Sequence, residues 1–210
     1  MKSLTIGITN LNPTWDIILN QIGPPYLHIN NSSFNTLNKH ACIIINSNST
    51  LIKDDIFKYI NEGGGVIIES KIAKKLFKIS TRNLFVKYVN TKFDKIFSRV
   101  TSGIINSTLI VSKNSKFLKD QYGRFLVDTL NIGKGYVIII PSDLINCIKS
   151  IENKRKNFPT YSNFFPNERV STVSKRTLRE IIYISLLEIY NKKNIPFLSL
   201  NSFPNAHKTI

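Results

Sequence analysis

The residue best placed for covalent chemistry in this sequence is Ser70, which follows the apolar run Val66 to Ile68. A serine hydroxyl at the end of a buried strand can act as a nucleophile if a neighbouring base accepts its proton. None of the three histidines, His28, His40 and His207, stands in a pattern that identifies it as this base. A serine that follows a strand is also a good N-cap for the next helix. We therefore expect Ser70 to be structural, with a small hydrolase or amidase that uses Ser70 as the alternative.

Polar side chains are expected to gather where the predicted parallel strands end. Open α/β sheets bind ligands in the crevice outside the carboxyl ends of their strands. The polar residues that follow the predicted strands are therefore candidate ligand contacts: Asn10, Asn46, Asn48, Ser70, Ser142 and Asp143.

Two patterns that could suggest a metal or a phosphate are better explained by local structure. Asp54 and Asp55 are adjacent, so their carboxylates point to different faces of a helix, and both suit a first helical turn. A phosphate-binding loop follows a strand and opens a helix, whereas the glycines at 63 to 65 precede a strand, as do Gly133 and Gly135. We predict neither a metal site nor a cofactor.

The strongest compositional signal is positive charge. The sequence has 29 Lys and Arg residues against 13 Asp and Glu residues, a net charge of +16. Such an excess suits nucleic acid or acidic polysaccharide. However, the basic residues are spread along the chain and RNA-binding motifs that interleave them with aromatic residues are missing, so we expect a diffuse effect and disfavour nucleic acid. The candidate anion-binding residues are Lys134, Lys154, Arg155 and Lys156.

The composition is typical of a globular cytoplasmic protein. The hydrophobic share of 42% is enough for a core. No apolar run approaches the roughly 20 residues of a membrane span, and the first residues lack the pattern of a secretory signal, so we expect no membrane partner. Cys42 and Cys147 have no CxxC spacing and are expected to be small core residues.

The segment from Ala41 to Ser70 has the pattern of a βαβ unit. The run Cys42 to Ile45 is typical of a strand buried on both faces. A helix with an apolar face is expected to follow from about Asp54, to end at the glycines at 63 to 65, and to lead into a second buried strand at Val66 to Ile68.

Further strands and helices extend this α/β pattern. We expect strands at Leu4–Ile8, Tyr26–Ile29 and Tyr136–Ile140, and helices at Pro13–Ile22 and Lys71–Lys78. Another helix is expected to run to about Glu152 from a cap formed by Pro141, Ser142 and Asp143. The fold class is therefore α/β, with a mostly parallel sheet flanked by helices. Between Leu84 and Gly135 strand-like pieces alternate with polar turns, which predicts a β-rich insertion.

The C-terminal third begins with a polar, aromatic segment and continues as the longest predicted helix. Apolar residues recur at three- and four-residue spacing from Ser174 to Asn191, so we expect this helix to dock on the domain, followed by a strand at Ile195–Leu200. The predicted organisation is an α/β domain at 1–153, an aromatic and basic loop at 154–173, a docked helix and strand at 174–203, and a flexible tail at 204–210.

The order of strand, polar loop, helix, Gly-Gly-Gly and strand, followed by GKGYVIIIPSDL at 133–144, resembles the class I glutamine-amidotransferase-like (flavodoxin-like) fold. The resemblance covers about Leu4 to Ile151. The segment from Arg169 to the end is similar to the part that joins such a domain to a polysaccharide-deacetylase barrel. The second resemblance implies a carbohydrate or protein partner, or a downstream catalytic domain.

The sequence departs from the amidotransferase pattern at the catalytic turn. Active members of that family place a cysteine in a Gly-x-Cys-x-Gly elbow and a His-x-Glu pair downstream. Here the matching position reads Glu69-Ser70-Lys71, without the cysteine or the glycines. The resemblance therefore implies a non-catalytic accessory or interaction domain, associated with carbohydrate metabolism. A hydrolase that uses Ser70 and a basic anion-binding protein remain the alternatives.

Overall fold

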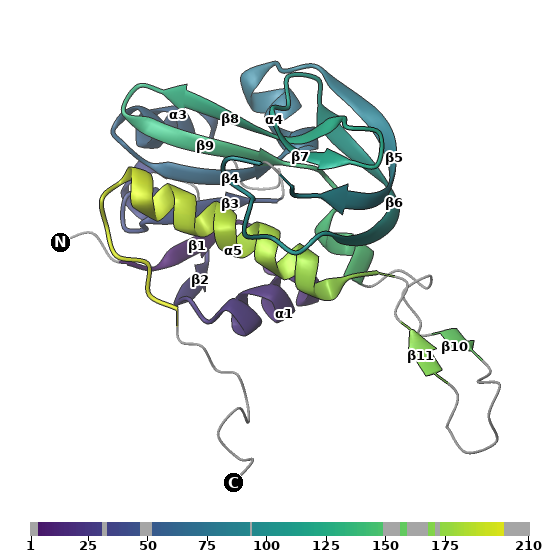
Figure 1. Ribbon diagram of the computed structural model, residues 1–210. Coiled ribbons are helices and arrows are strands. Elements are labelled where there is room, and N and C mark those ends of the chain that lie inside the picture. The colour runs from purple at the N-terminus through teal and green to yellow at the C-terminus, as the bar shows by residue number, and fades with distance from the viewer. Residues whose placement is uncertain are drawn as a thin grey trace, which may run out of the picture.

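The computed structural model describes residues 4–30, 33–46, 52–92, 94–148, 156–158, 168–170 and 173–199. Nine of its strands form one sheet in the order β2-β1-β3-β4-β9-β8-β7-β5-β6 (Figure 1). Their bounds are β1 Ile6–Ile8, β2 Tyr26–His28, β3 Cys42–Ile45, β4 Gly65–Glu69, β5 Thr81–Asn90, β6 Gly103–Ser112, β7 Phe117–Asp120, β8 Phe125–Ile132 and β9 Gly135–Ile140. The helices are α1 Pro13–Ile22, α2 Phe34–Leu37, α3 Lys53–Asn61, α4 Ser70–Phe77 and α5 Lys175–Lys192.

The sheet is mixed, so the prediction of a mostly parallel sheet is wrong. Strands β2, β1, β3, β4 and β9 are parallel to one another, which confirms the predicted βαβ unit of β3, α3 and β4. From β9 outward, the pairs β9–β8, β8–β7, β7–β5 and β5–β6 are all antiparallel. The predicted β-rich insertion is therefore a continuation of the sheet, because β8 forms a hairpin with β9.

Helices cover the parallel half of the sheet on both faces. The alternate strand residues Ile44, Ile67 and Ile138 share one hydrophobic core with α1 and α5. Their neighbours Ile43 and Ile68 belong to a second core with α3 and α4. Because successive side chains of a strand point to opposite faces, this alternation explains the unbroken apolar runs of β3, β4 and β9.

The β5–β6 hairpin reaches back to the carboxyl end of β9. Ile110 of β6 forms an isolated antiparallel bridge with Ser142, which lies just beyond β9. The Ser142 amide donates to the Ile110 carbonyl oxygen at 2.9 Å, and the Ile110 amide donates to the Ser142 carbonyl oxygen at 3.4 Å. The antiparallel half of the sheet thereby covers the ends of β4 and β9.

The helix predicted to run to about Glu152 is not formed as expected. Residues Ile145–Ile148 form only a short 3-10 helix (η1), and residues 149–155 lie outside the described residues. The predicted cap is not formed, because Ser142 is held in the bridge to Ile110 and Asp143 has a left-handed backbone with φ of 69°, whereas an N-cap residue is extended.

The segment after α5 packs without forming a strand. The predicted strand at Ile195–Leu200 is wrong for the described residues 195–199. The Phe197 ring lies edge-on to the rings of Tyr183 and Tyr190, at 5.7 and 5.0 Å between centroids. Pro196 also lacks an amide hydrogen for a ladder. The tail from 204 onward lies outside the described residues.

The segment predicted as a loop at 154–173 contains two paired strands. Strands β10 (Lys156–Phe158) and β11 (Glu168–Val170) are antiparallel, and the figure shows this ribbon to one side of the large sheet (Figure 1). None of the described helices is long and apolar enough to cross a membrane.

We predict that the contact between α5 and the sheet is a main source of stability. Ile182 on α5 is fully buried, so Ile182→Ala should lower the free energy of unfolding by about 2–4 kcal/mol in urea titrations. Ile17→Ala is the matched control, because Ile17 is 41% exposed on α1 and its truncation should change stability by about 0.5 kcal/mol or less. Equal effects of the two changes would contradict this role of α5.

Candidate functional site

The candidate site lies at the carboxyl ends of four parallel strands. Thr9 and Asn10 follow β1, Asn46 follows β3, Glu69 ends β4, and Ser142 lies just beyond β9. The order β1-β3-β4-β9 places these ends side by side along one edge of the sheet. The structure therefore brings most of the predicted crevice residues to one place.

At one end of this row of strand ends, which we call the crevice, lies an amide and hydroxyl cluster. The Asn46 side-chain amide donates to the Asn10 carbonyl oxygen at 2.7 Å, and the Thr9 hydroxyl donates to the Asn46 side-chain oxygen at 3.2 Å. The Asn46 backbone amide in turn donates to the Thr9 hydroxyl at 3.3 Å. These bonds fix Asn46, whereas Asn10 is exposed. Asn48 lies outside the described residues.

Ser70 is buried in a hydrogen-bond cluster at the middle of the crevice. Its hydroxyl donates to the carbonyl oxygen of Ile110 on β6 and lies 3.3 Å from the Ser142 hydroxyl. The Ser142 backbone amide donates to the Ser70 hydroxyl at 3.2 Å. Both serines are at most 1% exposed. The Ser70 hydroxyl is therefore used to attach β6 to the end of β4.

The expected N-cap role of Ser70 is wrong, and Ser142 takes a related role. Ser70 is already the first residue of α4, and the preceding Glu69 makes no side-chain capping bond. The Ser142 hydroxyl instead accepts from the Lys71 backbone amide at 2.8 Å. A residue distant in sequence thus satisfies one of the free amides at the start of α4.

Glu69 is the site residue that sequence reasoning missed. Its carboxyl group accepts hydrogen bonds from the Trp15 and Ser142 side chains and lies near the charge of Asp143. Burial, followed by repulsion from Asp143, raises the pKa of Glu69 from 4.5 to about 7. A carboxyl group with such a pKa can hold a proton at neutral pH. The signal in the sequence was a carboxylate at the end of a wholly apolar strand.

None of the described histidines is placed to act as a base for Ser70. His40 precedes β3, at the opposite end of the strands, where its Nδ1 lies 3.0 Å from the Thr5 hydroxyl and burial lowers its pKa. His28 ends β2, which β1 and β3 separate from β4, a span of about 14 Å at ordinary strand spacing. His207 lies outside the described residues. That Ser70 is not a nucleophile stays a prediction.

The candidate anion-binding residues are not brought together at the crevice. Lys134 lies in the turn between β8 and β9, where its backbone amide donates to the Asn61 carbonyl oxygen. The six residues of β9 lie between this turn and the end of the strand at which Ser142 is found. Lys154 and Arg155 lie outside the described residues, and only the backbone of Lys156 is described, in β10.

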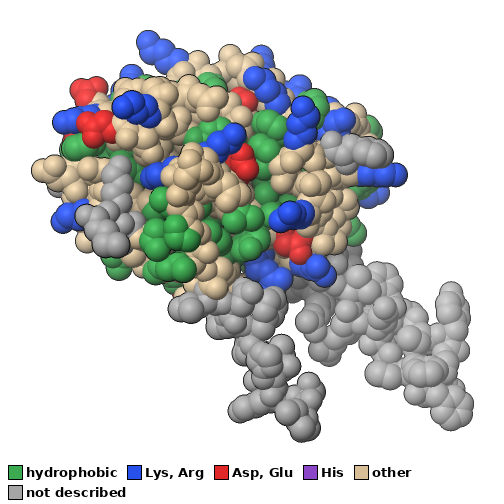
Figure 2. Space-filling view, turned by 60° about the vertical axis from the view of Figure 1, so that its left-hand side comes forward, with side chains coloured by type: hydrophobic (Ala, Val, Ile, Leu, Met, Phe, Trp, Pro, Cys, Tyr) green, Lys and Arg blue, Asp and Glu red, His purple; other side chains and the backbone are tan. Residues whose placement is uncertain are grey.

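Basic side chains are spread over the surface. On the face in Figure 2, Lys and Arg side chains occur in separate groups with few acidic side chains among them. Among the residues that the structure describes, no group of three or more His, Cys, Asp or Glu side chains could hold a metal ion. Cys42 and Cys147 are both buried and free, as expected for core residues.

We predict that Glu69 makes stability depend on pH between about 4.5 and 7. Because the pKa is raised in the folded state, that state binds more protons in this window, and the free energy of unfolding falls as pH rises. Glu69→Gln should remove most of this pH dependence. In urea titrations, the loss of unfolding free energy from pH 5 to pH 8 should be smaller in the variant than in the wild type by about 1–2 kcal/mol.

The control for this prediction is Asp143→Asn. Asp143 is exposed and its charge contributes to the raised pKa of Glu69, so its neutralisation should move the titration of Glu69, followed by NMR, to lower pH. A titration of Glu69 near pH 4.5 in the wild type would contradict the assigned environment.

Comparisons with known proteins establish a fold likeness and no family membership. No protein-family model matches the chain, and no curated protein matches it in sequence. A β-galactosidase from Halorubrum lacusprofundi has a TM-score of 0.52 at 9% identity, covering 94% of this chain and 31% of that one. The β-galactosidase from Bacillus circulans sp. alkalophilus has a TM-score of 0.52 at 9% identity, covering 93% and 32%. A ThuA-like protein from Bacteroides uniformis has a TM-score of 0.40 at 13% identity, covering 65% and 79%. The chain thus shares its fold with about a third of each β-galactosidase.

Proposed function

We propose that this chain is a non-catalytic accessory or interaction domain with a degenerate glutamine-amidotransferase-like fold, acting in the cytoplasm. The observation that carries the proposal is the Ser70 hydroxyl, which is buried and donates to the Ile110 carbonyl oxygen. At the position where the resemblance places the nucleophile, β6 occupies the space in front of the hydroxyl.

The hydrogen bonds of Ser70 argue against a role for its hydroxyl as a nucleophile. A nucleophile must reach the substrate and transfer its proton to a base. To expose Ser70, the two backbone hydrogen bonds between Ile110 and Ser142 would have to break. A movement of Ser142 would also weaken the hydrogen bond that its hydroxyl accepts from the Lys71 amide. Buried polar groups left without partners cost about 1–3 kcal/mol each.

An association with carbohydrate metabolism is the second part of the proposal. The β-galactosidases contain a similar fold as about a third of their length, which supports a role for this fold as one part of a longer carbohydrate-active protein. The more specific link to polysaccharide deacetylases rests on the sequence resemblance alone. We therefore propose a carbohydrate-active protein or catalytic domain as the partner of this chain.

The alternative that needs testing is a small hydrolase or amidase. We predict that the purified chain turns over neither activated esters, glutamine nor nitrophenyl glycosides at a rate that depends on Ser70. Ser70→Ala should leave any background rate unchanged and lower the free energy of unfolding by about 0.5–1.5 kcal/mol, because one hydrogen bond is lost while the Ile110 carbonyl oxygen keeps the Ser142 amide as a partner.

Ser80→Ala is the matched control, because Ser80 is exposed just beyond α4. It should change neither the background rate nor the stability. A turnover that disappears in Ser70→Ala but persists in Ser80→Ala, with both proteins folded by circular dichroism, would overturn the non-catalytic assignment.

A further inference from the structure

A pocket of about 340 Å³ lies on the antiparallel half of the sheet, far along the strand order from the crevice. Residues from β5, the turn that follows it, β7 and β8 line this pocket. Its lining is rich in lysine and phenylalanine: Lys92, Lys95, Lys116, Lys119, Phe117 and Phe125.

Strand register explains why cationic and aromatic side chains meet here. Lys119 of β7 lies opposite Asn90 of β5 on one side and Phe125 of β8 on the other. Directly opposed residues in antiparallel strands point to the same face, so all three face outward. The Lys119 ammonium lies 5.1 Å from the centre of the Phe125 ring, and Phe125 remains 36% exposed.

The two polar residues of the lining have their oxygens engaged by the backbone. The Asp94 carboxylate accepts from the amides of Ile96, Phe97 and Leu118 at 2.9, 2.7 and 2.6 Å. The Asn90 side-chain oxygen accepts from the Lys92 amide at 3.0 Å. These bonds hold the turn after β5 against β7. With four lysines and one aspartate, the lining has a net charge of +3.

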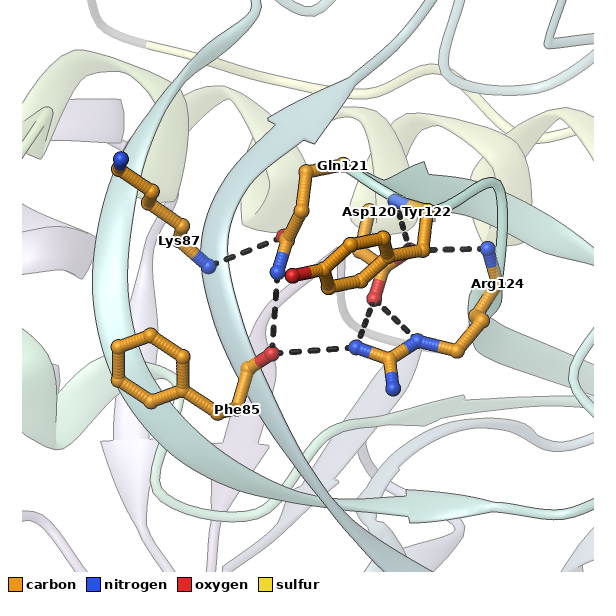
Figure 3. A network of polar contacts seen from close by, with 6 residues as sticks. All are labelled: Phe85, Lys87, Asp120, Gln121, Tyr122 and Arg124. Carbon is orange, nitrogen blue, oxygen red and sulfur yellow. Dashed lines mark hydrogen bonds and ion pairs between the residues drawn. The ribbon is translucent and has the colours of Figure 1, made fainter.

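The adjacent turn between β7 and β8 adds an exposed aromatic ring on a fixed support. The buried Asp120 carboxylate accepts from the Tyr122 and Arg124 backbone amides, both at 2.9 Å, and pairs with the Arg124 guanidinium at 2.6 Å (Figure 3). Arg124 and Gln121 also donate to the Phe85 carbonyl oxygen of β5, at 3.1 and 3.2 Å. Tyr122 is 75% exposed, and the Arg124 guanidinium lies 4.9 Å from the centre of its ring.

We propose that this pocket and the adjacent turn bind single-stranded nucleic acid. Lys95, Lys116 and Lys119 are exposed and would contact phosphates, and Phe125 and Tyr122 would stack with bases. Grooves that combine positive charge with exposed aromatic rings are the general solution for binding single strands without sequence preference. The proposal does not depend on the non-catalytic assignment of Ser70.

The chemistry of the lining favours nucleic acid over an acidic polysaccharide. The oxygens of Asp94 and Asn90, which could accept from sugar hydroxyls, already accept from backbone amides. Lysines and phenyl rings instead match phosphates and planar bases. The sequence did not reveal this site because its residues come from three separate segments, so the charge that we expected to act diffusely is partly gathered here.

The test is fluorescence anisotropy of the full chain with a labelled 20-nucleotide oligo-dT and with labelled heparin, at 50 and 200 mM salt. Lys116→Ala/Lys119→Ala should weaken oligo-dT binding at least tenfold and reduce the slope of log Kd against log salt by about 1.4, the value for two lost phosphate contacts on a single strand. Phe125→Leu, which keeps an apolar side chain, should weaken binding at least fivefold.

The matched control is Lys74→Ala/Lys75→Ala on α4, which removes the same charge from exposed positions outside the pocket. It should change the affinity less than twofold. Equal losses for the two lysine pairs, no effect of Phe125→Leu with the fold intact by circular dichroism, absence of oligo-dT binding at 50 mM salt, or binding of heparin in preference to oligo-dT would each overturn the proposal.

Discussion

The hydrogen bonds that join Ser70, Ile110 and Ser142 are the constraint on which this structure depends. They connect the start of α4, the far strand β6 and the end of β9 at one point. Apart from its pairing with β5, β6 meets the sheet through these bonds and through the Ser112 hydroxyl, which donates to the Asp128 carboxylate of β8 at 3.0 Å. With them, the nine-stranded sheet closes partly on itself at the place where an open α/β sheet has its ligand crevice.

This closure divides the crevice. The part at β4 and β9 is filled by buried hydroxyl groups, whereas Asn10 and Asn46 at the ends of β1 and β3 remain at or near the surface. Glu69 lies at the boundary, where partial burial and the nearby Asp143 favour its protonated form. The hydrogen bonds of the polar residues at this edge therefore link the strand ends to one another. The exposed aromatic and cationic side chains on β7, β8 and their turn offer a surface of a different kind.

Local pattern was enough to predict most elements of the parallel half. Asn12 accepts from the Thr14 and Trp15 amides, and Gly23 adopts φ of 81°, so the bounds of α1 could be read from the sequence. The unbroken apolar runs likewise identified β3, β4 and β9, because strands that are buried on both faces are apolar throughout. The mixed pairing could not be predicted in this way, because the apolar run of β9 suits a parallel or an antiparallel neighbour equally.

The sequence was enough to predict where the residues of the candidate site lie, but not which groups they contact. Strand ends placed Asn10, Asn46, Ser70 and Ser142 at the crevice. The partner of Ser70, however, lies 40 residues away in β6, and no local pattern indicates that contact. The raised pKa of Glu69 and the grouping of Lys119 with Phe125 depend in the same way on tertiary neighbours.

The most direct measurement of the central claim is the reactivity of a thiol placed at position 70. The natural cysteines, Cys42 and Cys147, are buried, so they should contribute little labelling in the native state. The account predicts that a small thiol reagent labels the Ser70→Cys variant only as fast as the protein unfolds, while the exposed control Ser80→Cys is labelled rapidly. Equally rapid labelling of the two folded variants would contradict the closure of this site by β6.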